Sequence, residues 1–108
     1  MIARAWHGAV LANKAAEYGR YVHETGVEDL RATEGNRGVY VLRRVENGLA
    51  HFLLISLWRS REDIRAFAGK DIKRARYYPE DEDYLLELEP YVTHYEVLVQ
   101  PEPATAAR

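Results

Sequence analysis

HFLLISLWRSREDIRAFAG, residues 51–69, is the segment that decides the fold. Its apolar run from Phe52 to Trp58 has the length and the branched and aromatic residues of a buried β-strand. Ser60 follows as a helix N-cap with acidic residues after it, and Gly69 suits the position just past the helix end. The segment therefore predicts the central strand of a sheet, leading directly into a short helix with Trp58 at the corner.

This strand is predicted to be the second half of a β-hairpin. Asn47-Gly48 is the strongest short hairpin signal, because a type I′ turn needs a positive φ at both central positions. A two-residue loop pairs Glu46 with Leu49 and so fixes which residues share a face. One face then holds Tyr40, Leu42, Arg44, His51, Leu53, Ile55 and Leu57, and the other holds Arg37, Val39, Val41, Arg43, Phe52, Leu54, Ser56 and Trp58. Both faces are apolar at their centres, so we expect a helix layer over one and a second subunit over the other.

The remaining segments complete the order β, α, β, β, α, β. Alternation predicts strands over Ile2 to Gly8 and Tyr91 to Val99. Helical spacing predicts a helix over Asn13 to Thr25, capped by Asn13 and ended by Gly26, and a further helix from Pro79 to Leu86. This is the order of a ferredoxin-like split β-α-β fold of the α+β class, an antiparallel sheet with helices on one face. We therefore predict a homodimer whose uncovered sheet faces pack together.

The length and composition of the chain limit the number of domains and the kinds of binding partner that can be expected. The 108 residues have room for a single domain, expected over residues 1–99, with residues 100–108 as a disordered tail. A net charge of -2 gives no reason to expect nucleic acid or an anionic membrane as partner. No apolar run approaches the ~20 residues that span a bilayer. The lack of cysteine excludes disulfides and thiolate metal sites, and a cytoplasmic location is the simplest expectation.

Four stretches resemble the antibiotic biosynthesis monooxygenase domain family: Ser56 to Ser60, Ile64 to Gly69, Ala75 to Asp81 and His94 to Val97. The resemblance implies a dimeric α/β barrel in which a small apolar or aromatic ligand lies between the sheet and the helices. It also implies oxygenase chemistry without a metal or flavin cofactor. A tryptophan at the position of Trp58 lines the pocket in that family and can donate its indole N–H.

The sequence departs from the family pattern at several positions. An asparagine that acts with the tryptophan is replaced by Leu54, which cannot polarise oxygen or hold a substrate hydroxyl. Haem-degrading members bind iron through a histidine on the helical segment after the tryptophan, whereas this chain has no histidine between His51 and His94. The first strand also has no asparagine. Haem degradation by the usual ligand set is therefore not expected.

The candidate site residues follow from the hairpin faces and from the resemblance. Trp58 is expected to orient substrate or oxygen, unless it simply packs on the following helix. His94 is expected to move a proton, because histidine titrates near neutrality. The predicted substrate-binding residues are Leu54, Phe52 and Val41 as an apolar wall, with Arg76 and Tyr77 for polar substituents.

Two neighbouring features have plainer interpretations. Tyr78 is expected to anchor a loop by packing. The acidic run from Glu80 to Asp83 is expected to be a solvated helix start rather than a metal site, because no histidine stands at ligand spacing. The sequence thus predicts a cofactor-independent monooxygenase acting on a small aromatic or quinone-like compound. The alternative, which Leu54 favours, is a non-catalytic ligand-binding or stress-associated homodimer of the same fold.

Overall fold

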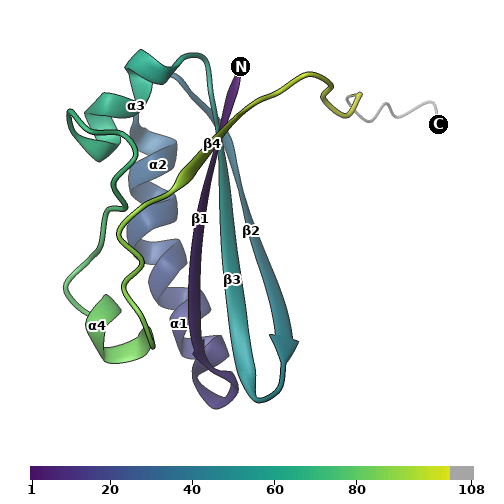
Figure 1. Cartoon of the computed structure of the whole chain (residues 1–108), viewed down its shortest axis with the longest axis vertical. Helices are drawn as coiled ribbons and strands as arrows, with labels where there is room; N and C mark the ends of the chain where they lie inside the picture. Colours follow the sequence, from purple (N-terminus) through teal and green to yellow (C-terminus); the bar gives the residue numbers. More distant parts are fainter. Residues whose placement is uncertain (103–108) are drawn as a thin grey trace.

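The computed structural model describes residues 1–102, which form one four-stranded antiparallel sheet with helices beside it (Figure 1). The strands are β1 (Ile2–Leu11), β2 (Asn36–Glu46), β3 (Leu49–Trp58) and β4 (Thr93–Glu96). Their order in the sheet is β2-β3-β1-β4, so the predicted ferredoxin-like α+β fold is confirmed. β3 pairs with β2 on one side and with β1 on the other, so the apolar strand that ends at Trp58 is a central strand of the sheet, as predicted.

The predicted hairpin turn is confirmed. Asn47 and Gly48 have φ values of 52° and 77°, both positive as a type I′ turn requires. Glu46 pairs with Leu49, and the predicted register continues along most of the two strands. Local turn chemistry therefore determines which side chains of β2 and β3 share a face.

The predicted register is wrong at the far end of the hairpin. Asn36, rather than Arg37, lies opposite Trp58, because the pairing shifts by one residue between Asn36 and Gly38. Gly38 has a φ of 138°, a conformation that side-chain-bearing residues rarely adopt. This β-bulge leaves Arg37 exposed rather than paired with the tryptophan.

One helical segment crosses the covered face of the sheet from end to end. It comprises a 3-10 turn (Ala12–Lys14), α1 (Ala15–Val22), a π-helical turn (His23–Val27) and α2 (Glu28–Ala32). The predicted end at Gly26 is therefore wrong, and Asn13 lies within the 3-10 turn instead of capping α1. The segment continues because Val27 and Leu30 are buried in the core, and this packing outweighs the low helix propensity of glycine.

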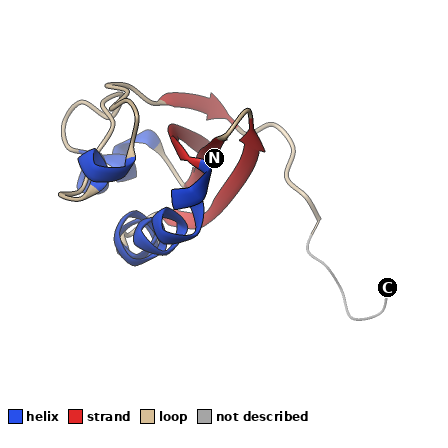
Figure 2. Ribbon diagram, turned by 90° about the horizontal axis from the view of Figure 1, so that it is seen from below, coloured by secondary structure: helices blue, strands red, loops and turns tan. Residues whose placement is uncertain are grey.

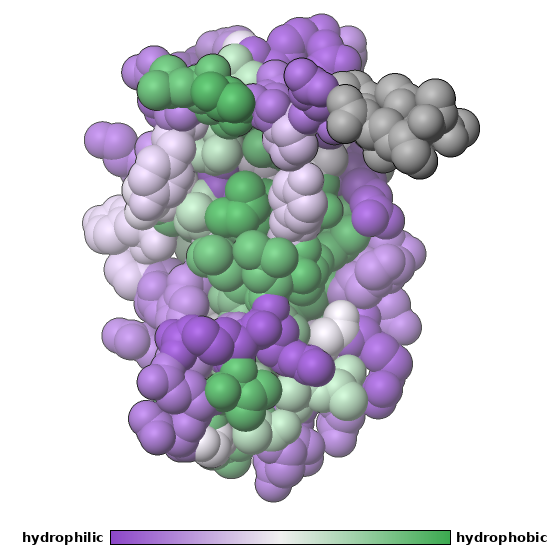
Figure 3. Space-filling view, turned by 90° about the vertical axis from the view of Figure 1, so that its right-hand side faces the viewer, coloured by the Kyte–Doolittle hydropathy of each residue, from purple (hydrophilic) through white to green (hydrophobic). Residues whose placement is uncertain are grey.

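The sheet has a covered side and an open side (Figure 2). Alternate residues of β1 and β3 point into the covered side, where the largest fully buried side chains are Trp58, Tyr18, Phe52, Ile64, Val10 and Val27. On the open side an apolar patch crosses the middle of the sheet (Figure 3). It includes Tyr40, Leu42 and Leu53, which are 52%, 47% and 36% exposed.

The chain after β3 is less regular than predicted. Ser60 caps α3 (Arg61–Ala68) by accepting the Asp63 N–H at 3.3 Å, and Gly69 ends this helix, as expected. α4 spans only Asp81–Tyr84, and β4 is shorter than the predicted strand. Contacts distant in sequence hold this region instead, such as the Leu86 N–H that donates to the Ala9 carbonyl at 3.0 Å. The predicted tail lies mostly in residues 103–108, outside the described part of the chain.

Within residues 1–102, no helix combines the length and the apolar character that crossing a membrane would require.

Candidate functional site

A cavity lies between the covered face of the sheet and the helical layer. Its volume is about 40 Å³, which is room for a few water molecules. The three buried polar or charged residues of the described chain all line it: Arg4, Ser56 and Asp81, which are 3%, 2% and 4% exposed. The other walls are mainly apolar or aromatic and include Trp6, Tyr18, Leu30, Leu54, Phe67 and Tyr78. Because burying polar groups costs free energy, their concentration here marks the cavity as the candidate site.

Arg4 is the buried cation of this cavity. β1 places it on the covered face, opposite Ser56 of β3 and His94 of β4. Its Nη2 donates to the Arg74 carbonyl at 2.9 Å, whereas its Nε has no hydrogen-bond partner among the described residues. The ion pairs found within residues 1–102 do not include it. Burial lowers the pKa of the guanidinium to about 10, and the guanidinium carbon lies 5.4 Å from the ring centre of Phe67.

His94 shares the face of Arg4 as its cross-strand neighbour. Its Nε2 is buried and has no hydrogen-bond partner within the described residues. Burial lowers the pKa of His94, and the nearby charges of Arg4, Arg61 and Lys73 lower it further. The imidazole is therefore neutral at neutral pH and can accept a proton.

Asp81 fastens the chain after α3 to the long helical segment. Its Oδ1 accepts the Tyr18 hydroxyl at 2.8 Å, and its Oδ2 accepts the Tyr78 N–H at 2.6 Å. The prediction of a solvated acidic run is wrong for Asp81, because Tyr18 reaches it from α1 and both side chains are buried. Burial raises the pKa of Asp81, and the hydrogen bonds from Tyr78 and Tyr18 oppose that shift.

The more exposed rim of the cavity is formed by Arg76 and Tyr78. Arg76 Nη1 donates to the Phe67 carbonyl at 3.0 Å, and its guanidinium lies 5.0 Å from the ring centre of Tyr78. Arg76 Nη2 and the Tyr78 hydroxyl both donate to Asp29 Oδ2, at 3.4 Å and 2.6 Å. Tyr78 thus lines the cavity and links α2 to the chain after α3. The sequence predicts only that Tyr78 anchors a loop by packing.

Tyr77 packs behind the cavity wall. Its ring meets the Trp6 ring nearly edge-on, with 6.2 Å between the ring centres, and its hydroxyl donates to the Glu89 carbonyl. The Trp6 indole N–H has no hydrogen bond of good geometry. Burial raises the pKa of Tyr77, and the neighbouring Trp6 indole opposes the shift.

Trp58 lies at the predicted corner and is fully buried. Its indole Nε1–H donates to Ser56 Oγ at 2.8 Å, and its ring centre is 6.4 Å from that of Phe67. Ser56 and Phe67 line the cavity, so Trp58 stands one layer behind the wall with its N–H already bonded. Its predicted role in orienting substrate stays a prediction.

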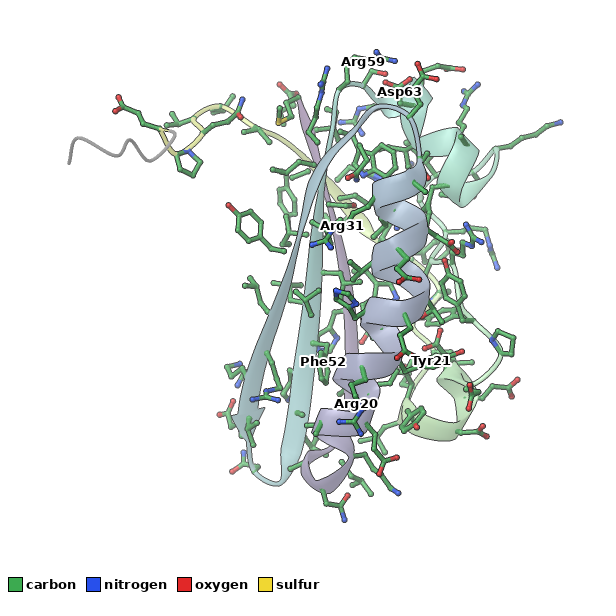
Figure 4. The ribbon with its side chains drawn as sticks, turned by 180° about the vertical axis from the view of Figure 1, so that it is seen from behind. Arg20, Tyr21, Arg31, Phe52, Arg59 and Asp63 are labelled. Atoms are coloured by element: carbon green, nitrogen blue, oxygen red, sulfur yellow. The ribbon has the colours of Figure 1, made fainter. Side chains whose placement is uncertain are left out.

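The remaining predicted wall residues lie at different depths. Leu54 lines the cavity. Phe52 lies on the side of the sheet that faces α1, and its ring meets that of Tyr18 with 5.2 Å between centres (Figure 4). Val41 lies opposite Leu54 on the edge strand β2 and is 41% exposed.

Sequence reasoning missed Arg4, Trp6 and Tyr18 as cavity residues. The alternation of the first strand already places Arg4 and Trp6 on one face. A charged residue on the same strand face as a tryptophan could therefore have indicated a buried polar site.

A second polar cluster lies on the open face of the sheet. His7 Nδ1 is 2.6 Å from Glu89 Oε2, and His7 Nε2 is 3.0 Å from His51 Nδ1, with the two imidazoles stacked. This cluster is on the side of the sheet opposite the cavity. No group of three or more side chains suited to holding a metal ion is found within residues 1–102.

Comparisons with family models and with curated proteins find no match to the chain. Solved structures do match it. A protein from Nitrosomonas europaea described as an antibiotic biosynthesis monooxygenase has a TM-score of 0.64 at 17% identity, covering 92% of this chain and 100% of that one. The chain has the antibiotic biosynthesis monooxygenase fold. A Bacillus cereus protein of the same description has a TM-score of 0.57 at 15% identity and 96% coverage of each chain. The haem degrader MhuD from Mycobacterium tuberculosis, solved with two haems in its active site, has a TM-score of 0.60 at 14% identity, covering 94% of this chain and 100% of that one.

The cavity of this chain does not fit a haem. Among the described residues, no histidine, cysteine or methionine lines it. The hydroxyls of Tyr18 and Tyr78, which do line it, are bonded to Asp81 and Asp29. The described lining of this cavity therefore offers no free axial ligand to a haem iron.

Proposed function

We propose that the chain is a cofactor-independent monooxygenase that oxidises a small aromatic or quinone-like compound in the cavity. The observation that supports this is the cavity itself, whose aromatic and apolar walls surround buried polar groups in a fold shared with proteins described as monooxygenases. Because the cavity holds only a few water molecules, substrate entry requires Arg76 and Tyr78 to swing away from Asp29.

His94 is the base of the proposed reaction. It does not line the cavity, but it is the cross-strand neighbour of Arg4, so the bound substrate must extend past Arg4 to reach it. Its neutral Nε2 takes a proton from an activated CH₂ group of the substrate, and the resulting anion reduces O₂. One oxygen atom becomes a carbonyl oxygen and the other leaves as water, so that CH₂ and O₂ give C=O and H₂O. Trp58 takes part in orientation only if Ser56 releases its indole N–H.

The proposal includes a cytoplasmic homodimer formed through the open face of the sheet. Tyr40, Leu42 and Leu53 form part of an apolar patch there, and apolar patches of this kind mark interaction surfaces (Figure 3). A second copy of the same face supplies a matching apolar surface.

A second candidate function is a non-catalytic homodimer that binds a small ligand. Leu54 favours it, because this cavity position offers a substrate no hydrogen bond. The indole N–H of Trp58 also favours this function, because it is already bonded to Ser56 and is not available to a substrate.

Oxygen uptake with a panel of anthrones and hydroquinones, in buffer treated with a metal chelator, separates the two candidates. The monooxygenase predicts uptake above the protein-free rate for at least one compound. His94→Gln should remove most of that uptake, whereas His23→Gln, on the exposed side of the helical segment, should leave it unchanged. No uptake with any compound, or equal uptake by the His94→Gln variant, would contradict the proposed enzyme.

A further inference from the structure

We propose that the ligand of this cavity is an anion, a small flat molecule with one carboxylate or phenolate oxygen, and that Arg4 recognises it. The inference rests on the proposed function for the place of the ligand. It adds the chemical class of the ligand and the residue that selects it.

The first support is a buried cation that pairs with no carboxylate of residues 1–102. Arg59 and Arg76 are exposed, yet each pairs with a carboxylate. Arg59 lies 2.8 Å from Asp63 (Figure 4), and Arg76 lies 3.4 Å from Asp29. Arg4 is only 3% exposed and is absent from the ion pairs of residues 1–102. Charged side chains are almost never fully buried unless they are paired. An anionic ligand in the cavity supplies the missing partner.

The second support is a pair of donors that face the same space. Arg4 and Ser56 are cross-strand partners on the covered face, and both line the cavity. Within the described part of the chain, the Arg4 Nε–H has no acceptor. The Ser56 hydroxyl accepts the Trp58 indole N–H, which leaves its own proton to donate. Together the guanidinium and the hydroxyl form a site for one anionic oxygen.

The third support is the difference between the two charged residues buried in the cavity wall, Arg4 and Asp81. Asp81 also lines the cavity, but both of its oxygens already accept hydrogen bonds, and its charge repels an anion. The anionic end of the ligand must therefore lie at Arg4, away from Asp81. The apolar body then lies against Leu30 and Leu54.

The test compares benzoate with benzamide, which has the same shape without the charge, and with ionised 4-nitrophenol. Binding is followed by NMR titration of the wild-type chain, Arg4→Met and the exposed control Arg31→Gln. Benzoate, 4-nitrophenolate or both should bind the wild type and Arg31→Gln equally, and benzamide should bind about 10- to 100-fold more weakly. Arg4→Met should lose the preference for the anion. Arg4→Lys, which keeps the charge without the Nε–H, should keep the preference with weaker binding. Arg4→Gln, which removes the charge but keeps a polar side chain, replaces Arg4→Met if that variant does not fold.

Benzamide binding as tight as that of both anions, unchanged anion binding by Arg4→Met, or no binding of any probe at millimolar concentration would overturn the inference. These results are separable from the fate of the proposed enzyme. Anion binding at Arg4 without oxygen uptake keeps the recognition site and removes the monooxygenase. Oxygen uptake with an unchanged KM in Arg4→Met keeps the monooxygenase and removes the recognition site.

Discussion

Tyr18→Phe should destabilise the protein far more than the loss of one hydroxyl from an exposed tyrosine would. The Tyr18 hydroxyl donates to Asp81 Oδ1 at 2.8 Å, and both side chains are buried. The variant leaves the Asp81 carboxylate with a single donor, the Tyr78 N–H. Hydrogen bonds to buried charged groups contribute about 1.5–3 kcal/mol, so a loss of about 2 kcal/mol is expected. The ring itself remains packed against Phe52 and Tyr84.

The cost of Tyr18→Phe should depend on pH. Burial raises the folded-state pKa of Asp81, so folding favours the protonated carboxyl and this group's contribution to stability falls as pH rises through that pKa. Removing the Tyr18 donor raises the pKa of Asp81 further. The penalty should therefore be fully present at neutral pH, and it should shrink in acid as Asp81 becomes protonated in the folded and unfolded states alike.

Urea unfolding at fixed protein concentration measures this prediction. At neutral pH the unfolding midpoint should fall by about 1–2 M, for a denaturant slope of about 1–2 kcal/mol per M. Tyr84→Phe is the matched control, because the Tyr84 hydroxyl bonds Glu17 at 3.3 Å in an exposed position. Equal effects of the two variants, or a Tyr18→Phe penalty that is the same at neutral and acid pH, would refute the role assigned to Asp81.

Three further predictions concern other parts of the molecule. Gly35→Ala should cost about 1–3 kcal/mol more than Gly69→Ala in urea unfolding. The two glycines have φ values of 91° and 92°, but only at Gly35 would an added Cβ collide with the side chain of Asp63. Equal costs of the two substitutions would contradict this close contact. In an NMR titration, His94 should have a pKa below 6.5, and because this folded-state pKa is lowered, the stability of the protein should fall as pH decreases through that range. Arg4→Met should raise the His94 pKa. An unchanged pKa in this variant would show that the Arg4 charge does not act on His94. Sedimentation of the wild-type chain should show a dimer. Leu53→Lys should convert it to a monomer, whereas Leu98→Lys, at an 87% exposed position, should leave the dimer intact. A monomeric wild type would contradict the proposed interface.

Local chemistry made the hairpin and the α3 cap predictable. Asn47-Gly48 selects its turn type whatever surrounds it, and the register of β2 and β3 follows from that turn. Ser60 accepts the Asp63 N–H within a single helical turn. Such features depend on neighbours that are close in sequence, so one sequence suffices to infer them.

The cavity could not be predicted in the same way, because its parts are distant in sequence. Tyr18 and Asp81 are 63 positions apart, and Tyr78 and Asp29 are 49 apart. No local pattern shows that an acidic helix start will be buried by a tyrosine from another helix. The prediction that the helix ends at Gly26 is wrong for a related reason. Core packing of the residues on both sides of Gly26 stabilises the helical segment beyond the glycine, which would otherwise favour a helix end.

The two tryptophans allow the central claim, that this cavity binds the ligand, to be tested in one measurement. Trp6 lines the cavity, whereas Trp58 lies behind its wall with its indole N–H bonded to Ser56. In a ¹⁵N-labelled chain titrated with benzoate or 4-nitrophenolate, the Trp6 indole signal should shift in a saturable way because its ring lines the cavity, and the Trp58 signal should shift with the same affinity because its acceptor, Ser56, contacts the ligand. A saturable shift of Trp58 without one of Trp6, or no shift of either, would contradict the claim.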